Sequence, residues 1–335
     1  MSQELPIAPP AATIAARSTT VSSLKTPVAT AFGALFLAIV ALSLAAIFIR
    51  LCEQELGPFA TIFNRFWIAF LCLLTWNQVN ALLARRRNAS TDAAAPTPTM
   101  VYSRADILLL ILAGVMFWFC LALWAWSLTQ TGVANSTILH NLTPIFITVG
   151  AWLFLGQKFD TRFAVGLVLA LVGGTALGLG DLQAGADSFV GDVASLLSAA
   201  FSAANLILIE RLRSKYSAAI IIQWCCGVGV LLTFPVMLVT ETQIFPISWL
   251  GWFYAICLAL VCQIVGQGLQ AYCVKVLRSS LVGIFLLLDP VLAALIAWGI
   301  FAESLSVFNW VSFFVVIFGI YLAKTSKYAD RVLAE

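Results

Sequence analysis

The chain repeats itself, and this internal repeat constrains its fold more than any other sequence feature. Residues 136–177 align without a gap with residues 282–323, at a spacing of 146 positions. Pro144 then corresponds to Pro290, and Gly173 to Gly319. Both stretches are almost wholly apolar, so we expect the repeat to lie inside a membrane. Duplicated membrane proteins with a site at the repeat interface are typically transporters, which makes a carrier the leading hypothesis.

The composition excludes an ordinary soluble domain. Of the 335 residues, 62% are hydrophobic and only 10% are charged, whereas soluble domains are about half apolar and about a quarter charged. The net charge of +3 comes from Lys and Arg in short connections, without the basic stripe that binds nucleic acid. The eight cysteines lie nearly all within apolar runs, and the chain has one histidine. We therefore expect no disulfide framework, no metal site and no cofactor.

Ten segments approach the roughly 20 apolar residues that a helix needs to cross a bilayer. These predicted spans are 29–51, 58–80, 106–128, 133–155, 163–180, 190–210, 217–240, 249–271, 281–301 and 307–324. The first 28 residues are rich in Ala, Pro, Ser and Thr, which predicts a mobile tail. The chain is thus divided into a tail over 1–28, five-helix repeats over 29–180 and 190–325, and a second tail over 326–335.

The distribution of basic residues predicts the orientation, because Lys and Arg translocate poorly and accumulate in cytoplasmic loops. With the N-terminus inside, 16 of the 18 basic residues fall on cytoplasmic segments. The two exceptions are Arg50 at an outer helix end and Arg65 within a span. Five spans per half is an odd number, so the second half is inverted relative to the first. We predict an all-α membrane protein with ten transmembrane helices in two inverted five-helix repeats and with both termini cytoplasmic.

A motif near the end of the second repeat points to a known family. It reads Leu287-Leu288-Asp289-Pro290-Val291, followed by Ala302-Glu303 and a last span that contains Gly319. The first repeat has a weaker version in Thr143-Pro144 and in Gly156-Gln157, with Gln where the family usually has Glu. Over nearly all of residues 29–325 the chain resembles the EamA-type carriers of the drug/metabolite transporter superfamily. The resemblance implies a multi-pass metabolite carrier of a bacterial inner membrane, without naming a substrate.

Charged groups inside a bilayer are expensive, so two of them are candidate site residues. Arg65 lies about seven residues into the second predicted span, about 10 Å deep. We interpret it either as a substrate contact or as a structural residue, which fixes helix packing through a salt bridge or by capping backbone carbonyl groups. Asp289 lies near the midplane of the ninth span. Its two interpretations are proton exchange during transport and satisfaction of backbone groups freed by Pro290.

Further candidates come from polar side chains in other spans. His140 and Asn141 lie one turn before Pro144. His140 can bind a polar substrate, relay protons or hydrogen-bond to a neighbouring helix. Asn205 belongs to a serine-rich stripe in the sixth span, which either lines a cavity or allows close helix packing. We interpret Glu303 as a gate or a helix-end anchor.

Three glutamines predict a polar wall. Gln263, Gln267 and Gln270 recur at helical spacing, so we expect them to share one face of the eighth span. Trp124 is the repeat counterpart of Gln270 and belongs to an aromatic face of the third span. If both faces line the central cavity, the cavity is polar on one wall and aromatic on the other. The alternative is hydrogen bonding between helices, at about 0.6 kcal/mol per contact.

Together these features predict a secondary transporter rather than an enzyme. The expected substrate is a small neutral or zwitterionic organic metabolite, exported by alternating access. An organic-phosphate or nucleotide-sugar antiporter is the alternative among carriers, although such anions need several intramembrane cations. A membrane scaffold or receptor is the alternative from another class. The predicted partners are the substrate, membrane lipid and a coupling proton, without nucleic acid, and the oligomeric state stays open.

Overall fold

The structure is a computed structural model that describes residues 28–90, 102–179, 188–301 and 306–334. Within these ranges the regular structure is helical and contains no strand, which confirms the predicted all-α class. Glu303 and nearly all of the predicted N-terminal tail lie outside the described residues.

The helices of the first repeat follow the predicted order. They are α1 (Val28–Cys52), α2 (Pro58–Ser90), α3 (Arg104–Gln130), α4 (Val133–His140), α5 (Thr143–Leu155) and α6 (Thr161–Leu179).

The second repeat has the same plan with one further interruption. Its helices are α7 (Phe189–Leu212), α8 (Ala218–Thr240), α9 (Trp249–Cys257), η1 (Leu258–Gln267), α10 (Gly268–Phe285), α11 (Leu288–Phe301) and α12 (Val307–Lys324). A final helix, α13 (Lys327–Ala334), forms where the sequence indicated only a tail.

Eight helices of the described chain are long and apolar enough to cross a membrane, and the stretch Thr161–Leu177 is a shorter apolar helix. Residues 249–285 count as one of the eight, because α9, η1 and α10 run on without a gap. Large apolar side chains such as Leu231, Val239 and Trp249 are exposed on the surface. A bilayer is the solvent in which such a surface is favourable.

The long run over 249–285 contains a sharp turn at Arg278, whose φ is 58° and ψ is 159°. A non-glycine residue in the left-handed region costs about 1–3 kcal/mol, so the surrounding packing must hold this turn. The turn separates the predicted eighth segment from the start of the ninth, and the ninth continues as α11. The polar residues Lys275, Arg278, Ser279 and Ser280 mark this turn in the sequence, between the predicted eighth and ninth spans.

Helix ends follow local chemistry. Ser188, Ser217, Ser248 and Ser306 precede α7, α8, α9 and α12, and each hydroxyl accepts a backbone N–H of the first turn. A serine in this position satisfies one of the free donors of the helix. Gly156 ends α5 in the left-handed conformation, with φ of 64°, which glycine adopts without strain.

Two transmembrane helices are broken at corresponding points of the repeat. In the first repeat the break lies between α4 and α5, just before Pro144. In the second it lies between α10 and α11, just before Pro290. Proline removes one helical hydrogen bond and clashes with the preceding turn, so both breaks have the same cause. Broken helices near the midplane are where secondary transporters place their substrate and ion sites.

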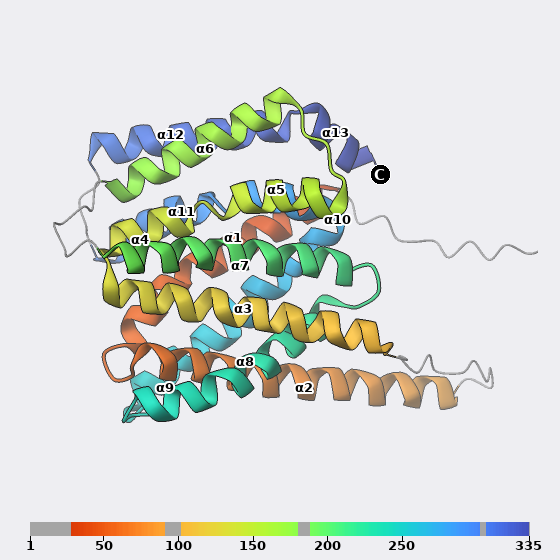
Figure 1. Ribbon diagram of the computed structural model, residues 1–335. Coiled ribbons are helices and arrows are strands. Elements are labelled where there is room, and N and C mark those ends of the chain that lie inside the picture. The colour runs from red at the N-terminus through yellow and green to blue at the C-terminus, as the bar shows by residue number, and fades with distance from the viewer. Residues whose placement is uncertain (1–27, 91–101, 180–187, 302–305, 335) are drawn as a thin grey trace, which may run out of the picture.

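The last helices of the two repeats pack together as images of each other. A Cβ atom on Gly173 of α6 would lie 2.9 Å from the Ser312 carbonyl oxygen of α12. A Cβ on Gly319 of α12 would lie 2.7 Å from the Gly166 carbonyl oxygen of α6. The two contacts are equivalent, because Gly173 corresponds to Gly319 and Gly166 to Ser312 at the repeat spacing of 146. The two helices run antiparallel along one edge of the bundle (Figure 1). Only glycine allows this close approach.

Near the opposite edge, α2 packs antiparallel against α8, so each repeat contributes one helix to this pair as well (Figure 1). Phe66 of α2 fills the space over Gly229 of α8, and Phe70 lies over Gly227. Nearer the start of α2, the ring of Phe63 lies 5.9 Å from that of Phe234. Along these three contacts the residue numbers rise in α2 and fall in α8, so the two helices are antiparallel.

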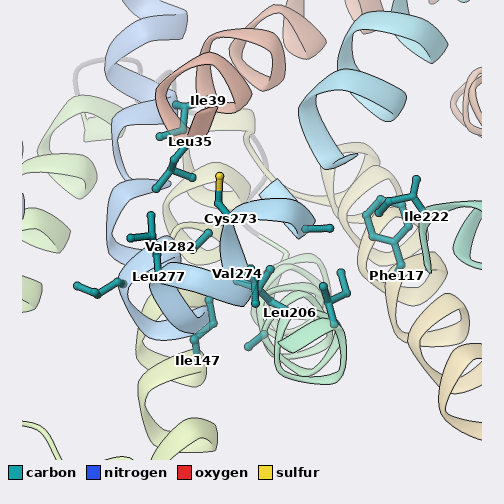
Figure 2. Close-up of a cluster of buried hydrophobic side chains, with 14 of the residues drawn as sticks. Leu35, Ile39, Phe117, Ile147, Leu206, Ile222, Cys273, Val274, Leu277 and Val282 are labelled. Atoms are coloured by element: carbon teal, nitrogen blue, oxygen red, sulfur yellow. The ribbon is translucent and has the colours of Figure 1, made fainter. Parts of the chain in front are cut away.

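The apolar core lies between the repeats and surrounds α10. Figure 2 shows Cys273 and Val274 of α10 beside Leu35 and Ile39 of α1, with Leu206 of α7 close by. All five side chains are almost fully buried. The core therefore joins helices of both repeats and supports the broken segment that precedes α11.

Candidate functional site

The centre of the bundle holds one buried cation, Arg65 of α2. Its Nε donates a hydrogen bond of 2.7 Å to Oε1 of Gln263 in η1. Arg65 is 5% exposed and Gln263 is fully buried. No carboxylate in the described part of the chain forms a salt bridge with Arg65. Thus the salt-bridge interpretation has no support here, and the charge is compensated only by an amide oxygen.

Helices from several directions meet around this guanidinium. The thiols of Cys120 in α3, Cys226 in α8 and Cys262 in η1 lie close enough to interact with its charge. Nε2 of Gln263 donates to Sγ of Cys226 at 3.5 Å. Arg65 therefore lies between the third and eighth predicted spans, the two walls that the sequence placed around a cavity.

A π-helix positions Gln263. The segment η1 makes the wider turns of a π-helix over ten residues, and π-helical turns are frequent at functional sites. Gln263 and Gln270 are both buried, whereas Gln267 is partly exposed. Oε1 of Gln270 has no hydrogen-bond partner among the residues that the structure describes. The wider turns change the helical register, so the three amides lie in different surroundings rather than forming one uniform face.

Asp289 lies at the start of α11, in the second helix break, and is bonded to Ser43 of α1. The Oγ of Ser43 lies 2.6 Å from Oδ1 of Asp289 and 2.9 Å from the carbonyl oxygen of Ile39. No salt bridge joins Asp289 to Arg65 within the described residues, although the Cys262 thiol lies in electrostatic range of both. The site thus presents a cation and a carboxyl group that do not neutralise each other.

His140 lies at the end of α4, in the first helix break. Its Nδ1 is 2.9 Å from Oγ of Ser198 in α7, and this hydroxyl donates to the Cys120 carbonyl oxygen at 2.8 Å. Since Ser198 has one hydroxyl hydrogen, Nδ1 of His140 is the donor in this arrangement and Nε2 keeps a free lone pair. The Trp124 ring lies 5.5 Å from the imidazole. The buried Nε1 of Trp124 has no hydrogen-bond partner among the described residues.

Asn205 and Asn141 are the two remaining predicted residues. Nδ2 of Asn205 donates to the Ala113 carbonyl oxygen at 2.9 Å, which joins α7 to α3. This contact matches the packing interpretation of the serine-rich stripe. Asn141 ends α4, and its backbone N–H bonds to the Thr137 carbonyl oxygen. Its side chain is half-buried beside His140.

Ser43 and Ser198 are site residues that the sequence did not single out as such. Ser198 was visible only as one member of the serine-rich stripe, and Ser43 is one hydroxyl in an apolar span. Helical spacing carries no signal for either, because their partners lie far away in the chain: 58 positions for His140 and 246 for Asp289.

At one end of the bundle, two glutamates join the repeats. Glu55 follows α1, and its carboxylate accepts hydrogen bonds from the backbone N–H groups of Ile247 and Ser248 and from the Ser248 hydroxyl. Glu241 follows α8 and accepts the Phe59 N–H of α2 at 2.7 Å. The Ser248 hydroxyl and these backbone donors lower the pKa of Glu55. Each acid caps a helix of the other repeat.

At the other end, Gln157 lies at the centre of a buried polar network. Its Nε2 donates to Glu210 at 3.0 Å, and its Oε1 accepts the hydroxyls of Ser280 and Tyr328, each at 2.7 Å. The second oxygen of Glu210 accepts the Ser279 N–H, just after the Arg278 turn, at 2.7 Å. The network therefore connects α5, α7, α10 and α13.

No cluster of three or more His, Cys, Asp or Glu side chains in the described chain is arranged to hold a metal ion. The eight cysteines are free thiols.

A duplicated, all-helical membrane fold with broken helices and a polar centre is typical of membrane transporters. Comparison with protein families agrees with this class: the model of the EamA-like transporter family matches residues 30–178 and 189–325. The chain belongs to the EamA-like transporter family. It is therefore an integral, multi-pass membrane protein, and its family points to a transporter rather than an enzyme.

Individual relatives are more distant. The pseudopaline exporter CntI of Pseudomonas aeruginosa is 27% identical over 135 residues, which are 40% of this chain and 47% of the relative. This chain thus spans about half the length of that exporter. An uncharacterized transporter of Archaeoglobus fulgidus is 22% identical over 84% of this chain and 93% of its own length. A solved crystal structure covers 88% of this chain and 97% of its own at a TM-score of 0.71 and 16% identity, which shows the shared fold.

Proposed function

We propose that the protein is a secondary transporter that exports a small zwitterionic or neutral organic metabolite by alternating access. The observation that carries this proposal is Arg65, a buried cation at the centre of the bundle that has an amide partner but, among the described residues, no carboxylate partner. A carboxylate of a substrate supplies what this guanidinium lacks. Charge-assisted hydrogen bonds of this kind are about twice as strong as neutral ones.

The architecture proposed for this cycle has ten spans in two inverted repeats, with both termini cytoplasmic. Its support is the antiparallel packing of α6 on α12 and of α2 on α8. Two inverted, similar halves can exchange conformations, so that one arrangement is open inward and the other outward. The likeness to an exporter supports the outward direction of transport.

A zwitterion fits the centre better than a simple anion does. Arg65 can bind a carboxylate, and Asp289, half-buried in the nearby helix break, can bind an ammonium group when ionised. Amides such as that of Gln267 can complete the binding of an uncharged polar substrate.

The antiporter of organic phosphates remains the second candidate among carriers. A phosphate dianion calls for several cations, whereas the centre described above offers Arg65 and, on protonation, His140. A receptor or scaffold would bind without translocation.

The test is export of toxic amino-acid analogues by a strain that depends on this protein. Arg65→Gln should lower apparent affinity about 10- to 100-fold, because a charged hydrogen bond of about 1.5–3 kcal/mol is lost. Arg65→Lys should retain part of it. Arg104→Gln is the matched control, since Arg104 is an exposed cation at a helix end. Unchanged transport in folded Arg65→Gln protein would refute the assignment of Arg65.

Topology has a separate test. Cysteine probes at Lys215 and in 81–90 should react from the cytoplasm, and probes at Glu55 and Glu241 from outside, in a background without native cysteines. Labelling of Glu241 from the cytoplasm alone would overturn the ten-span arrangement.

A further inference from the structure

The Ser43 hydroxyl has one hydrogen but three hydrogen-bond acceptors within reach. Its Oγ lies 2.6 Å from Oδ1 of Asp289, 2.9 Å from the Ile39 carbonyl oxygen and 3.3 Å from the backbone oxygen of Asp289. A hydroxyl carries one hydrogen and can accept two more hydrogen bonds. The position of that hydrogen therefore depends on whether Asp289 carries a proton.

The two protonation states of Asp289 use Ser43 differently. When Asp289 is ionised, the Ser43 hydroxyl donates to Oδ1, because a charged acceptor is stronger than a carbonyl. When Asp289 is protonated, the carboxyl group donates to Oγ, and the Ser43 hydrogen turns to the Ile39 carbonyl oxygen. Both states are thus satisfied without movement of the helices, and only a hydroxyl at position 43 permits this.

The surroundings leave Asp289 without a competing charge. Helix α11 packs against α1, α6 and α12. In the described chain these three helices bring Ser43 but no charged group into range of Asp289, and η1 brings the Cys262 thiol. Asp289 also lies at the N-terminus of α11, where the helix dipole stabilises a negative charge. A carboxyl group with one neutral partner and no fixed counter-ion can exist in both protonation states.

We propose that Asp289 and Ser43 form the proton-binding site of this carrier, with Ser43 as the positioning residue. The inference rests on the proposed transport function. The ionised Asp289 binds the ammonium group of a substrate, and the protonated form cannot do so. Proton and substrate therefore occupy one carboxyl group in turn: a proton from outside replaces the departing substrate, and it is released to the cytoplasm when the next substrate binds. This exchange makes the carrier a proton antiporter.

The first experiment observes the proton directly. Infrared spectroscopy of the purified full-length protein, titrated with pH, should show the C=O band of a protonated carboxyl group that is absent in Asp289→Asn. In Ser43→Ala the midpoint of this band should move up by about one pH unit, because the ionised form loses its hydrogen-bond donor. Ser43→Thr keeps the hydroxyl and should titrate as the wild type does.

A matched control separates this effect from a general loss of a serine. Ser312 of α12 is buried and donates to the Phe308 carbonyl oxygen four residues earlier, as Ser43 does to Ile39, but it has no carboxyl partner. Ser312→Ala should leave the band unchanged. An unshifted midpoint in Ser43→Ala, or the absence of an Asp289 band at every pH, would overturn the proposal.

The second experiment uses proteoliposomes, with labelled amino acids as probes. Asp289→Asn should lose accumulation driven by a pH gradient, and exchange between equally loaded compartments should need higher substrate concentrations, since Asn accepts hydrogen bonds but carries no charge for the ammonium group. This variant keeps the proposal testable if Ser43→Ala does not fold. Gradient-driven accumulation that survives in Asp289→Asn refutes the proton site while leaving the carrier function intact. A titrating band without transport of any probe refutes the carrier function instead.

Discussion

In the first repeat, the helix break between α4 and α5 holds His140 and Thr143, whereas the corresponding break between α10 and α11 holds Leu286 and Asp289. The backbones agree because each break is caused by a proline. The side chains differ: Thr143 bonds to the His140 carbonyl oxygen within its own break, and Asp289 reaches Ser43 of the other repeat. The duplicated backbone thus sets where a polar group can lie, whereas the side chain at that position differs between the two repeats.

The repeats also differ at the two helix faces that the sequence predicts as cavity walls. Trp124 and Gln270 occupy equivalent positions, and each has one buried polar atom without a partner. The Trp124 atom is a donor, whereas the Gln270 atom is an acceptor. The first repeat therefore presents an aromatic donor and the second an amide acceptor at equivalent positions.

Making the two breaks alike should have the largest effect. Asp289→Thr places the residue of the first repeat in the second, and the protein should still fold because Thr143 supports the equivalent break. Accumulation driven by a pH gradient should be lost, which for one coupled proton is about tenfold per pH unit. Proteoliposome uptake with and without a gradient measures this. Normal coupling in Asp289→Thr would show that the two breaks do not differ in function.

Making the walls alike should have a smaller effect. Gln267→Leu introduces the residue of the first repeat, since Leu121 is the counterpart of Gln267. A lost substrate hydrogen bond of about 0.5–1.5 kcal/mol lowers transport about two- to tenfold. Purified yield and melting temperature should stay near wild type, because the side chain of Gln267 makes no hydrogen bond within the described chain. If yield falls in step with transport, the amide has a structural role.

Removing the imidazole should change little. His140→Leu introduces the counterpart residue Leu286 and breaks the bond to Ser198. The expected cost is about 0.6 kcal/mol, the average for a hydrogen bond between membrane helices, and pH-driven accumulation should persist. Thermal unfolding and uptake check both points. Loss of coupling in this variant would move the proton site to the first repeat.

The smallest effect is expected at the end where Glu55 and Glu241 cap helices. The pKa of Glu55 is lowered chiefly by the Ser248 hydroxyl, so its stabilising contribution is complete above its unfolded pKa of about 4.3 and is lost as pH falls through the lower, folded pKa. Wild-type melting temperature should therefore fall below about pH 4, and Glu55→Gln should weaken this acid dependence. Glu241→Gln is the comparison, because Glu241 has one backbone donor. Identical acid profiles for Glu55→Gln and wild type would contradict the assignment.

From its residues alone, the chain specifies its membrane class, its duplication and its family. The apolar composition indicates a membrane protein, and the 146-residue spacing reveals the repeat. Pro144 and Pro290 predict where two helices break. Each of these properties is local or periodic, so it can be read along the chain. The number of spans stays a prediction, because helices run on without a gap from residue 249 to residue 285 and count as one span, whereas the sequence divides the stretch 249–301 into two.

Only the tertiary structure decided which polar residues meet. Arg65 pairs with Gln263 across 198 positions, and Asp289 with Ser43 across 246. Such pairs depend on how each helix is rotated and packed against its neighbours, and close contact at residues such as Gly173 and Gly319 sets those rotations. Gln263, the partner of Arg65, lies in the π-helix η1, which the sequence did not predict. In a bilayer the lipid is as apolar as the side chains, so the periodicity of apolar residues does not show which helix faces pack together. Shape complementarity between the helices determines these contacts.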